Sequence, residues 1–311
     1  MDQELYDACK NGQAEKVKQF IRKSNINLNY QDELERTPLW IACKKGHIEV
    51  VKLLLYEERI DLNIENLNGV TPFYIACEKG RTEIVKLLLN DQRVEINKAE
   101  GNGWTPFYVA CQEGCIEIVK LLLNDKRIDV NKKENNDHRT PFWIACEKEH
   151  IDILKLLLND QRVDVNQENR SSYTPFYITC FRNQVGVIIL LLNDKRIEIN
   201  KPNSENETPF YVACEKGHIE VVKLLLHDNR VDINRVSNKG WTPFGIACKN
   251  EHIEILQYIL VSGRQVNTLV QPGVKASIIK FLESFKSDPN ETRTRWRKGF
   301  ELSSNQSLFE F

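Results

Sequence analysis

The chain has 311 residues, more than one hydrophobic core usually holds, so its length indicates two domains or an elongated fold. A charged fraction of 28% and a net charge of −1 fit a folded protein and argue against the strongly basic face needed to bind nucleic acid or anionic membrane. There is no run of about 18 apolar residues, and the polar N-terminus lacks a signal-peptide core. We therefore expect an intracellular, cytoplasmic protein with no membrane partner.

One residue type recurs at an almost constant interval. Eight of the nine cysteines lie 34 or 35 residues apart: Cys9, Cys43, Cys77, Cys111, Cys146, Cys180, Cys214 and Cys248. A disulfide framework does not space its cysteines evenly, whereas a repeated structural position does. Stacked helices lie about 8–10 Å apart, beyond the roughly 7 Å Cα separation that a disulfide spans. We predict that these cysteines are reduced packing residues.

The dipeptide Thr-Pro recurs with the same period and predicts where helices begin. It starts at Thr37, Thr71, Thr105, Thr140, Thr174, Thr208 and Thr242. Thr accepts hydrogen bonds from free N–H groups at a helix start, and Pro suits the first helical position. We predict one helix over 71–79, a Gly80 cap, and a second helix over 83–89, where apolar residues have helical spacing. A long polar loop follows, and each such pair buries its apolar face only by stacking on its neighbours.

The repeated pattern resembles the ankyrin repeat. Residues 37–47 read TPLWIACKKGH, IEVVKLLL follows at 48–55, and the signature is nearly intact again at 208–234. The resemblance implies an all-α solenoid of helix–turn–helix units with long loops. The repeat departs from the family by an extra residue after the second helix, as in 90–93, where the family usually has Gly. The predicted ankyrin-repeat domain covers 1–269 in about eight repeats: 1–32, 33–66, 67–100, 101–135, 136–169, 170–203, 204–237 and 238–269.

The repeat pattern stops before a C-terminal helical tail, predicted over 270–311. Residues 276–285 have the apolar spacing of an amphipathic helix, and 291–300 predict a second helix that carries several Arg residues around Trp296. Two roles are open for the tail. It covers the last repeat as a cap, or it docks onto an acidic patch of a partner.

No motif for catalysis, a metal or a cofactor appears in the sequence. The chain lacks Cys-x-x-Cys, His-Glu-x-x-His and a phosphate-binding glycine loop. Four of the six histidines occupy one position before the second helix, one or more repeats apart, which is too far to share a metal ion: His47, His150, His218 and His252. Cys115 lies out of register with the other cysteines, and nothing near it implies catalysis. We therefore expect a non-enzymatic protein with no cofactor and no small-molecule substrate.

One position varies where its neighbours do not. The residue before each Thr-Pro is Arg36, Val70, Trp104, Arg139, Tyr173, Glu207 or Trp241. A packing position would stay uniform, so we expect this one to face solvent. Trp, Tyr and Arg are enriched at binding hot spots, although these aromatic rings would alternatively lie flat on a neighbouring loop. The candidate partner-binding residues are Arg36, Trp104, Arg139, Tyr173, Phe181, Arg182 and Trp241.

A second aromatic row recurs four residues later. Its members are Tyr6, Trp40, Tyr74, Tyr108, Trp143, Tyr177 and Tyr211. We expect them to pack between repeats, with an exposed aromatic stripe as the alternative. The ankyrin resemblance implies that recognition uses the loop tips and the concave helix face. The predicted function is a scaffold or adaptor that captures another protein there, the alternative being an adaptor whose tail recruits a second, ligase-type or nucleic-acid-associated complex.

Overall fold

The computed structural model describes residues 1–268, 271, 274–287 and 289–304. The chain divides into two compact units, Met1–Arg170 and Ser171–Phe311. Within the described residues all regular structure is helical, and none of these helices is long and apolar enough to cross a membrane. The all-α architecture predicted from the sequence is confirmed, whereas the predicted boundary between repeats and tail at 269 stays a prediction.

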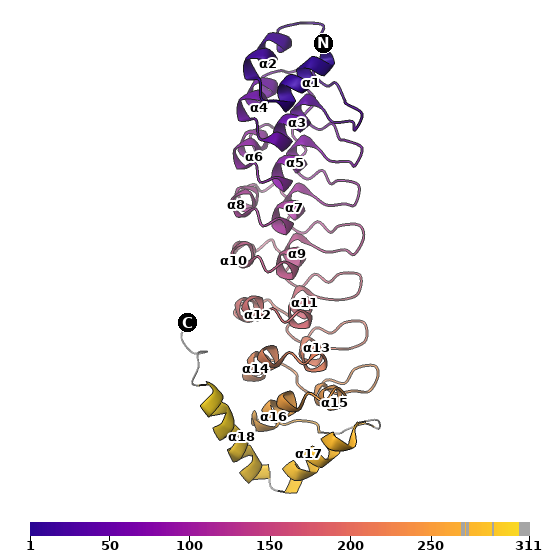
Figure 1. The fold of residues 1–311 in the computed structure, drawn as a ribbon, viewed down its shortest axis with the longest axis vertical. Coiled ribbons are helices and arrows are strands. Elements are labelled where there is room, and N and C mark those ends of the chain that lie inside the picture. Colours follow the sequence, from indigo (N-terminus) through magenta and orange to yellow (C-terminus); the bar gives the residue numbers. More distant parts are fainter. Residues whose placement is uncertain (269–270, 272–273, 288, 305–311) are drawn as a thin grey trace. The chain divides into compact units, whose positions relative to one another are not determined.

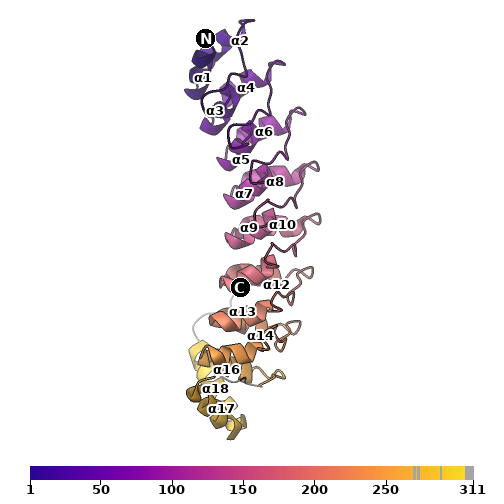
Figure 2. The same cartoon turned by 90° about the vertical axis from the view of Figure 1, so that its right-hand side faces the viewer.

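Unit 1 is built from five pairs of short helices. The pairs are α1 (Asp2–Lys10) and α2 (Ala14–Ile21), α3 (Pro38–Lys45) and α4 (Ile48–Leu55), α5 (Pro72–Glu78) and α6 (Thr82–Leu89), α7 (Pro106–Gln112) and α8 (Ile116–Asn124), α9 (Pro141–Glu147) and α10 (Ile151–Asn159). The odd-numbered helices stack in one layer and the even-numbered helices in a second (Figures 1 and 2). The long loops project from the odd-numbered layer (Figure 1).

Unit 2 repeats this arrangement and ends in two longer helices. Its pairs are α11 (Pro175–Phe181) and α12 (Val185–Leu192), α13 (Pro209–Lys216) and α14 (Ile219–His227), α15 (Pro243–Lys249) and α16 (Ile253–Val261). The tail forms α17 (Ala276–Ser287) and α18 (Pro289–Ser304).

Thr-Pro starts a helix at every one of its seven positions, as predicted. The Thr105 hydroxyl accepts a hydrogen bond of 3.0 Å from the Tyr108 N–H, and Pro106 follows as the first helical residue. The other six Thr side chains cap their helices in the same way. Gly80 closes the first helix of its pair at φ +66°, a conformation that costs glycine little.

The uniform positions form the core. All eight periodic cysteines are free and have 0% exposure, which confirms their prediction as packing residues. Burial raises the pKa of Cys9 to about 12. The second aromatic row is also buried, with Tyr74 and Tyr108 only 4% and 2% exposed. The Trp40 indole N–H donates to the Val70 carbonyl of the next loop at 2.9 Å, so this row packs between repeats and does not form an exposed stripe.

Of the two tail helices, α18 packs on α16 of the last repeat pair, and α17 packs on α18. Arg293 of α18 donates from Nε to the Leu260 carbonyl at 3.1 Å, near the C-terminal end of α16. The guanidinium also lies over the Phe285 ring, 5.4 Å from its centroid, and Ile278 of α17 is fully buried. A cation at the carbonyl end of a helix is favourable because the last carbonyls lack partners inside the helix.

Candidate protein-interaction surface

In six of the long loops, the tip just before Thr-Pro is closed by the polar side chain of the first residue of that tip. In the third loop of unit 1, the Glu100 carboxylate accepts from the N–H groups of Asn102 and Trp104 at 2.9 and 3.2 Å. The loop closes where the Glu100 N–H donates to the Trp104 carbonyl at 3.0 Å. The same role falls to Asp32, Asn66, Glu134, Asn203 and Ser237. In these six loops the backbone of the residue before Thr-Pro is therefore held in place by its own tip.

Successive loop tips are joined by backbone hydrogen bonds. The Leu67 N–H donates to the Leu34 carbonyl at 3.2 Å, and the Gly101 N–H donates to the Asn68 carbonyl at 3.1 Å. In unit 2 the Asn238 N–H donates to the Glu205 carbonyl at 2.8 Å. We call the surface made by these long loops and the adjoining side of the odd-numbered helices the loop face of each unit.

In unit 1 the variable residues of the loop face rest on the buried aromatic row. The Arg36 guanidinium and the Lys44 ammonium both lie over the Trp40 ring, 5.8 and 5.2 Å from its centroid. Trp104 stacks on Tyr108 with ring centroids 5.7 Å apart and an interplanar angle of 25°. Each of these variable side chains is half-buried, so one surface packs and the other faces solvent.

Two arginines of unit 1 differ in how they are held. Arg36 pairs with Asp32, and Arg139 lies over Trp143 at 5.1 Å and pairs with Glu147 at 3.1 Å. Burial raises the pKa of Asp32, but hydrogen bonds from Arg36, from the Leu34 N–H and from the Tyr6 hydroxyl outweigh it and lower the pKa to about 2. Both guanidinium groups are thus fixed in place before any partner arrives.

In unit 2 the loop face carries a column of three aromatic rings. Tyr173 stacks on Tyr177 at 4.6 Å and on Phe181 at 6.5 Å. Phe181 is 36% exposed, and Lys216 lies over its ring at 5.1 Å. Arg182 beside it is exposed.

Trp241 occupies the same position in the last repeat of unit 2. Gly245 replaces the aromatic residue on which other variable side chains rest, and Lys249 lies over the indole ring at 5.2 Å. The variable aromatic rings of both units therefore contact residues four or eight positions along their own helix. The alternative in which these rings lie on a neighbouring loop stays a prediction; Trp104 lines a hollow together with Leu67, Asn68 and Gly69 of that loop.

Sequence reasoning missed two exposed leucines of the loop face. Leu34 and Leu67 are 48% and 57% exposed at adjacent loop tips. The signal that would have found them is local: these are the only apolar residues at the second and third loop positions of the Thr-Pro repeats.

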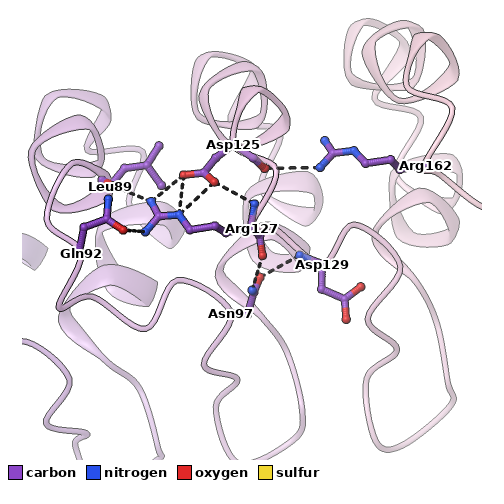
Figure 3. Close-up of polar contacts among 7 residues, drawn as sticks. All are labelled: Leu89, Gln92, Asn97, Asp125, Arg127, Asp129 and Arg162. Carbon is purple, nitrogen blue, oxygen red and sulfur yellow. Dashed lines mark hydrogen bonds and ion pairs between the residues drawn. The ribbon is translucent and has the colours of Figure 1, made fainter.

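On the other side of the repeats, an Asp-x-Arg motif fills the position of the extra residue (Figure 3). Asp125 accepts from the Arg127 side chain through both oxygens, at 3.1 Å from Nε and 2.6 Å from Nη2. Arg127 then donates from Nη2 to the Leu89 carbonyl at 2.9 Å, at the end of α6 in the preceding repeat. Arg93 and Arg162 reach the carbonyls of Leu55 and Leu123 in the same way.

An asparagine completes each of these links between repeats. Asn97 donates to the Arg127 carbonyl at 2.7 Å and accepts from the Asp129 N–H at 2.9 Å (Figure 3). Equivalent bridges start from Asn29, Asn63, Asn131, Asn200 and Asn234. This side of the chain is thus uniform between repeats, unlike the loop face.

The periodic histidines also link repeats. The ring Nε2 atoms of His47 and His150 lie 3.1 and 2.9 Å from the carbonyl oxygens of Lys10 and Gln112 in the preceding repeat. His218 and His252 contact Phe181 and Glu215 equivalently. Within the described part of the chain, no three His, Cys, Asp or Glu side chains are grouped to hold a metal ion.

Comparison with known families agrees with this architecture. The family model described as ankyrin repeats (3 copies) matches residues 5–100, 46–134, 92–169, 127–203 and 176–269. A search of the curated proteins finds no match to the chain. The matched segments together run from residue 5, within α1, through α16, with the Thr caps and long loops between them. The chain therefore belongs to the ankyrin-repeat family.

Proposed function

We propose that the protein is a non-enzymatic scaffold or adaptor that captures another protein on its loop face. The observation that carries this proposal is that most repeat positions keep the same residue type, whereas the position before Thr-Pro does not. The Thr, Cys and Asn positions repeat almost unchanged and hold the fold, whereas the half-buried residue before Thr-Pro changes from Arg to Val, Trp, Tyr or Glu. Packing gives no reason for this variation, but recognition of a particular partner does.

The geometry supports this role because the variable side chains are held in place before binding. Trp104 stacks on Tyr108, and Tyr173 on Tyr177. A partner that covers them immobilises few additional rotatable bonds, so less of the interaction energy is lost to ordering. An intracellular, cytoplasmic location is part of the proposal, and the nine free cysteines fit a reducing compartment.

The proposal is tested by using the full chain to capture proteins from a lysate of the native cell and measuring the amount of each captured protein. Two double variants, W104A with R139A in unit 1 and Y173A with F181A in unit 2, examine the loop face of each unit separately. Loss of a hot-spot side chain costs about 2 kcal/mol, so we expect at least one double variant to retain less than about a tenth of the specifically captured protein.

The control variant alters the opposite side of the repeats. Lys120 and Lys155 are exposed on second helices, where the one ion pair of each among the described residues is with a carboxylate three residues before it. The double variant K120A with K155A should capture as much as the wild type. Undiminished capture by both loop-face variants, with unchanged helicity and melting, would place the binding site elsewhere.

The alternative of a recruiting tail is tested without deleting the tail. The contact between Arg293 and Leu260 supports a capping role for α18. Arg295 and Lys298 are exposed on the same helix. If the tail is a cap alone, reversing both charges to Glu should leave the captured set unchanged, whereas selective loss of one captured complex would favour the recruiting tail.

A further inference from the structure

Two open hollows lie side by side on the loop face of unit 1. The first, of about 250 Å³, is lined by Leu34, Arg36, Trp40 and Lys44 of the first Thr-Pro repeat. The second, of about 660 Å³, is lined by Leu67, Tyr74, Glu100 and Trp104 of the next two repeats. Asn68, Val70 and Glu78 line both hollows. The two hollows therefore adjoin, and together we call them the trough; it runs over α3 and α5 to Trp104, which precedes α7.

The middle of this trough is apolar and exposed. Leu34 and Leu67 sit at adjacent loop tips, 48% and 57% exposed, and their backbones are hydrogen-bonded to each other. Val70 and Trp104 continue the apolar lining toward α7. About half of each leucine is exposed, and a bound segment would bury that apolar surface.

The two ends of the trough carry opposite charge. The first hollow is lined by the cations Arg36, Lys44 and Lys79 and by a single carboxylate, Glu78. Arg36 pairs with Asp32 and Lys79 pairs with Glu78, whereas Lys44 makes no ion pair among the described residues and lies over Trp40.

Glu78 also lines the second hollow, together with Glu100, and no cation is among its lining residues. A carboxylate of a partner is therefore attracted at the α3 end and repelled at the α7 end.

We propose that the trough binds an extended segment of a partner protein in which an acidic residue lies about three positions from a bulky apolar residue. The carboxylate pairs with Lys44 of α3, and the apolar side chain seats against Leu67 and Val70, which precede α5 one repeat away. The spacing follows from the fold: neighbouring first helices are about 8–10 Å apart, and an extended chain advances about 3.3 Å per residue. The proposal rests on the loop face being the protein-binding surface and specifies its partner chemistry in unit 1.

A library of random linear peptides displayed on phage, selected on the full chain, tests the proposal. The selected peptides should be enriched in Asp or Glu three positions from Leu, Ile, Phe or Trp. Synthetic copies of them should bind about tenfold more weakly to the variant Lys44→Glu and to Leu67→Ser, and binding should weaken as salt rises. Neither side chain is part of the core, so both variants should melt like the wild type.

The matched control is Lys249→Glu. Lys249 occupies the same repeat position as Lys44 and lies over Trp241 as Lys44 lies over Trp40, with both distances 5.2 Å, but it belongs to unit 2. Binding of the selected peptides should be unchanged in this variant. Peptides that show no acidic preference, that ignore Lys44→Glu, or that lose binding equally in Lys249→Glu would overturn the proposal, as would a library from which nothing is enriched.

Failure of this proposal and failure of the proposed function are distinguishable. If the loop-face double variants lose the captured cellular protein while the peptide preference is absent, the loop face binds proteins by other chemistry and only the trough is wrong. If the loop-face variants and Lys44→Glu all leave binding unchanged, both proposals are wrong.

Discussion

Removing one guanidinium of the Asp-x-Arg series should weaken the coupling between two repeats. Arg127 donates to the Leu89 carbonyl at 2.9 Å and to the Gln92 side chain at 3.0 Å, both in the preceding repeat, and pairs with Asp125 at 2.6 Å. A hydrogen bond to a backbone carbonyl contributes about 1 kcal/mol, and an exposed ion pair about 0.2–1 kcal/mol. The variant Arg127→Ala should therefore lose about 1–2 kcal/mol of unfolding free energy.

Urea unfolding followed by far-ultraviolet circular dichroism measures this loss. Amide hydrogen exchange should locate it at the end of α6 and in the loop that contains Gln92, because the lost bonds end there. Lys120→Ala is the control, since Lys120 pairs only with Glu117 of its own helix, with both side chains exposed. That change should cost under about 0.5 kcal/mol. If Arg127→Ala is no more destabilising than Lys120→Ala, the arginine does not couple the repeats.

Three further predictions concern the capping, packing and loop positions. Thr105→Ala removes the buried cap of α7 and should lower the unfolding free energy by about 1 kcal/mol; an unchanged urea midpoint would contradict the capping role. Burial raises the pKa of both Cys111 and Cys115, but Cys115 is only partly buried. A maleimide should therefore modify Cys115 first and reach Cys111 only when the protein unfolds, which peptide mass spectrometry would show. Because the folded pKa of Asp32 is lowered to about 2, the stabilising effect of its carboxylate is complete above about pH 4 and is lost as the pH falls through 2. The difference in unfolding free energy between the wild type and Asp32→Asn should therefore shrink between about pH 4 and about pH 2. A constant difference would show that the carboxylate charge is not involved.

Much of the fold is predictable because it depends on local chemistry repeated in register. Thr105 and Pro106 favour a helix start and Gly80 favours a stop, and because these signals recur in register the helix pairs could be predicted from the sequence. The buried cysteines follow from their even spacing. The sequence also shows the extra residue after the second helix, but it does not show the structural role of that residue. Arg127 acts on a carbonyl in the preceding repeat, and no local propensity reports such a contact.

The candidate surface was only partly predictable for a similar reason. Variation before Thr-Pro identified Trp104 and Tyr173, but not what supports them, because stacking on a residue four positions later depends on the side-chain rotamer. Leu34 and Leu67 become neighbours only through the hydrogen bond between two loops. That Leu34 lines the same hollow as Lys44, and that the charge differs between the two ends of the trough, required the structure.

We propose that the uniform positions hold the fold while the loop face binds the partner. Hydrogen exchange on the full chain, with and without the purified captured partner, tests it most directly. The account predicts protection at the loop tips, such as 32–36 and 100–104, and along the adjoining first helices, with little change at the Asp-x-Arg loops such as 125–127. Protection confined to those loops, to the second helices or to α17 and α18 would contradict it.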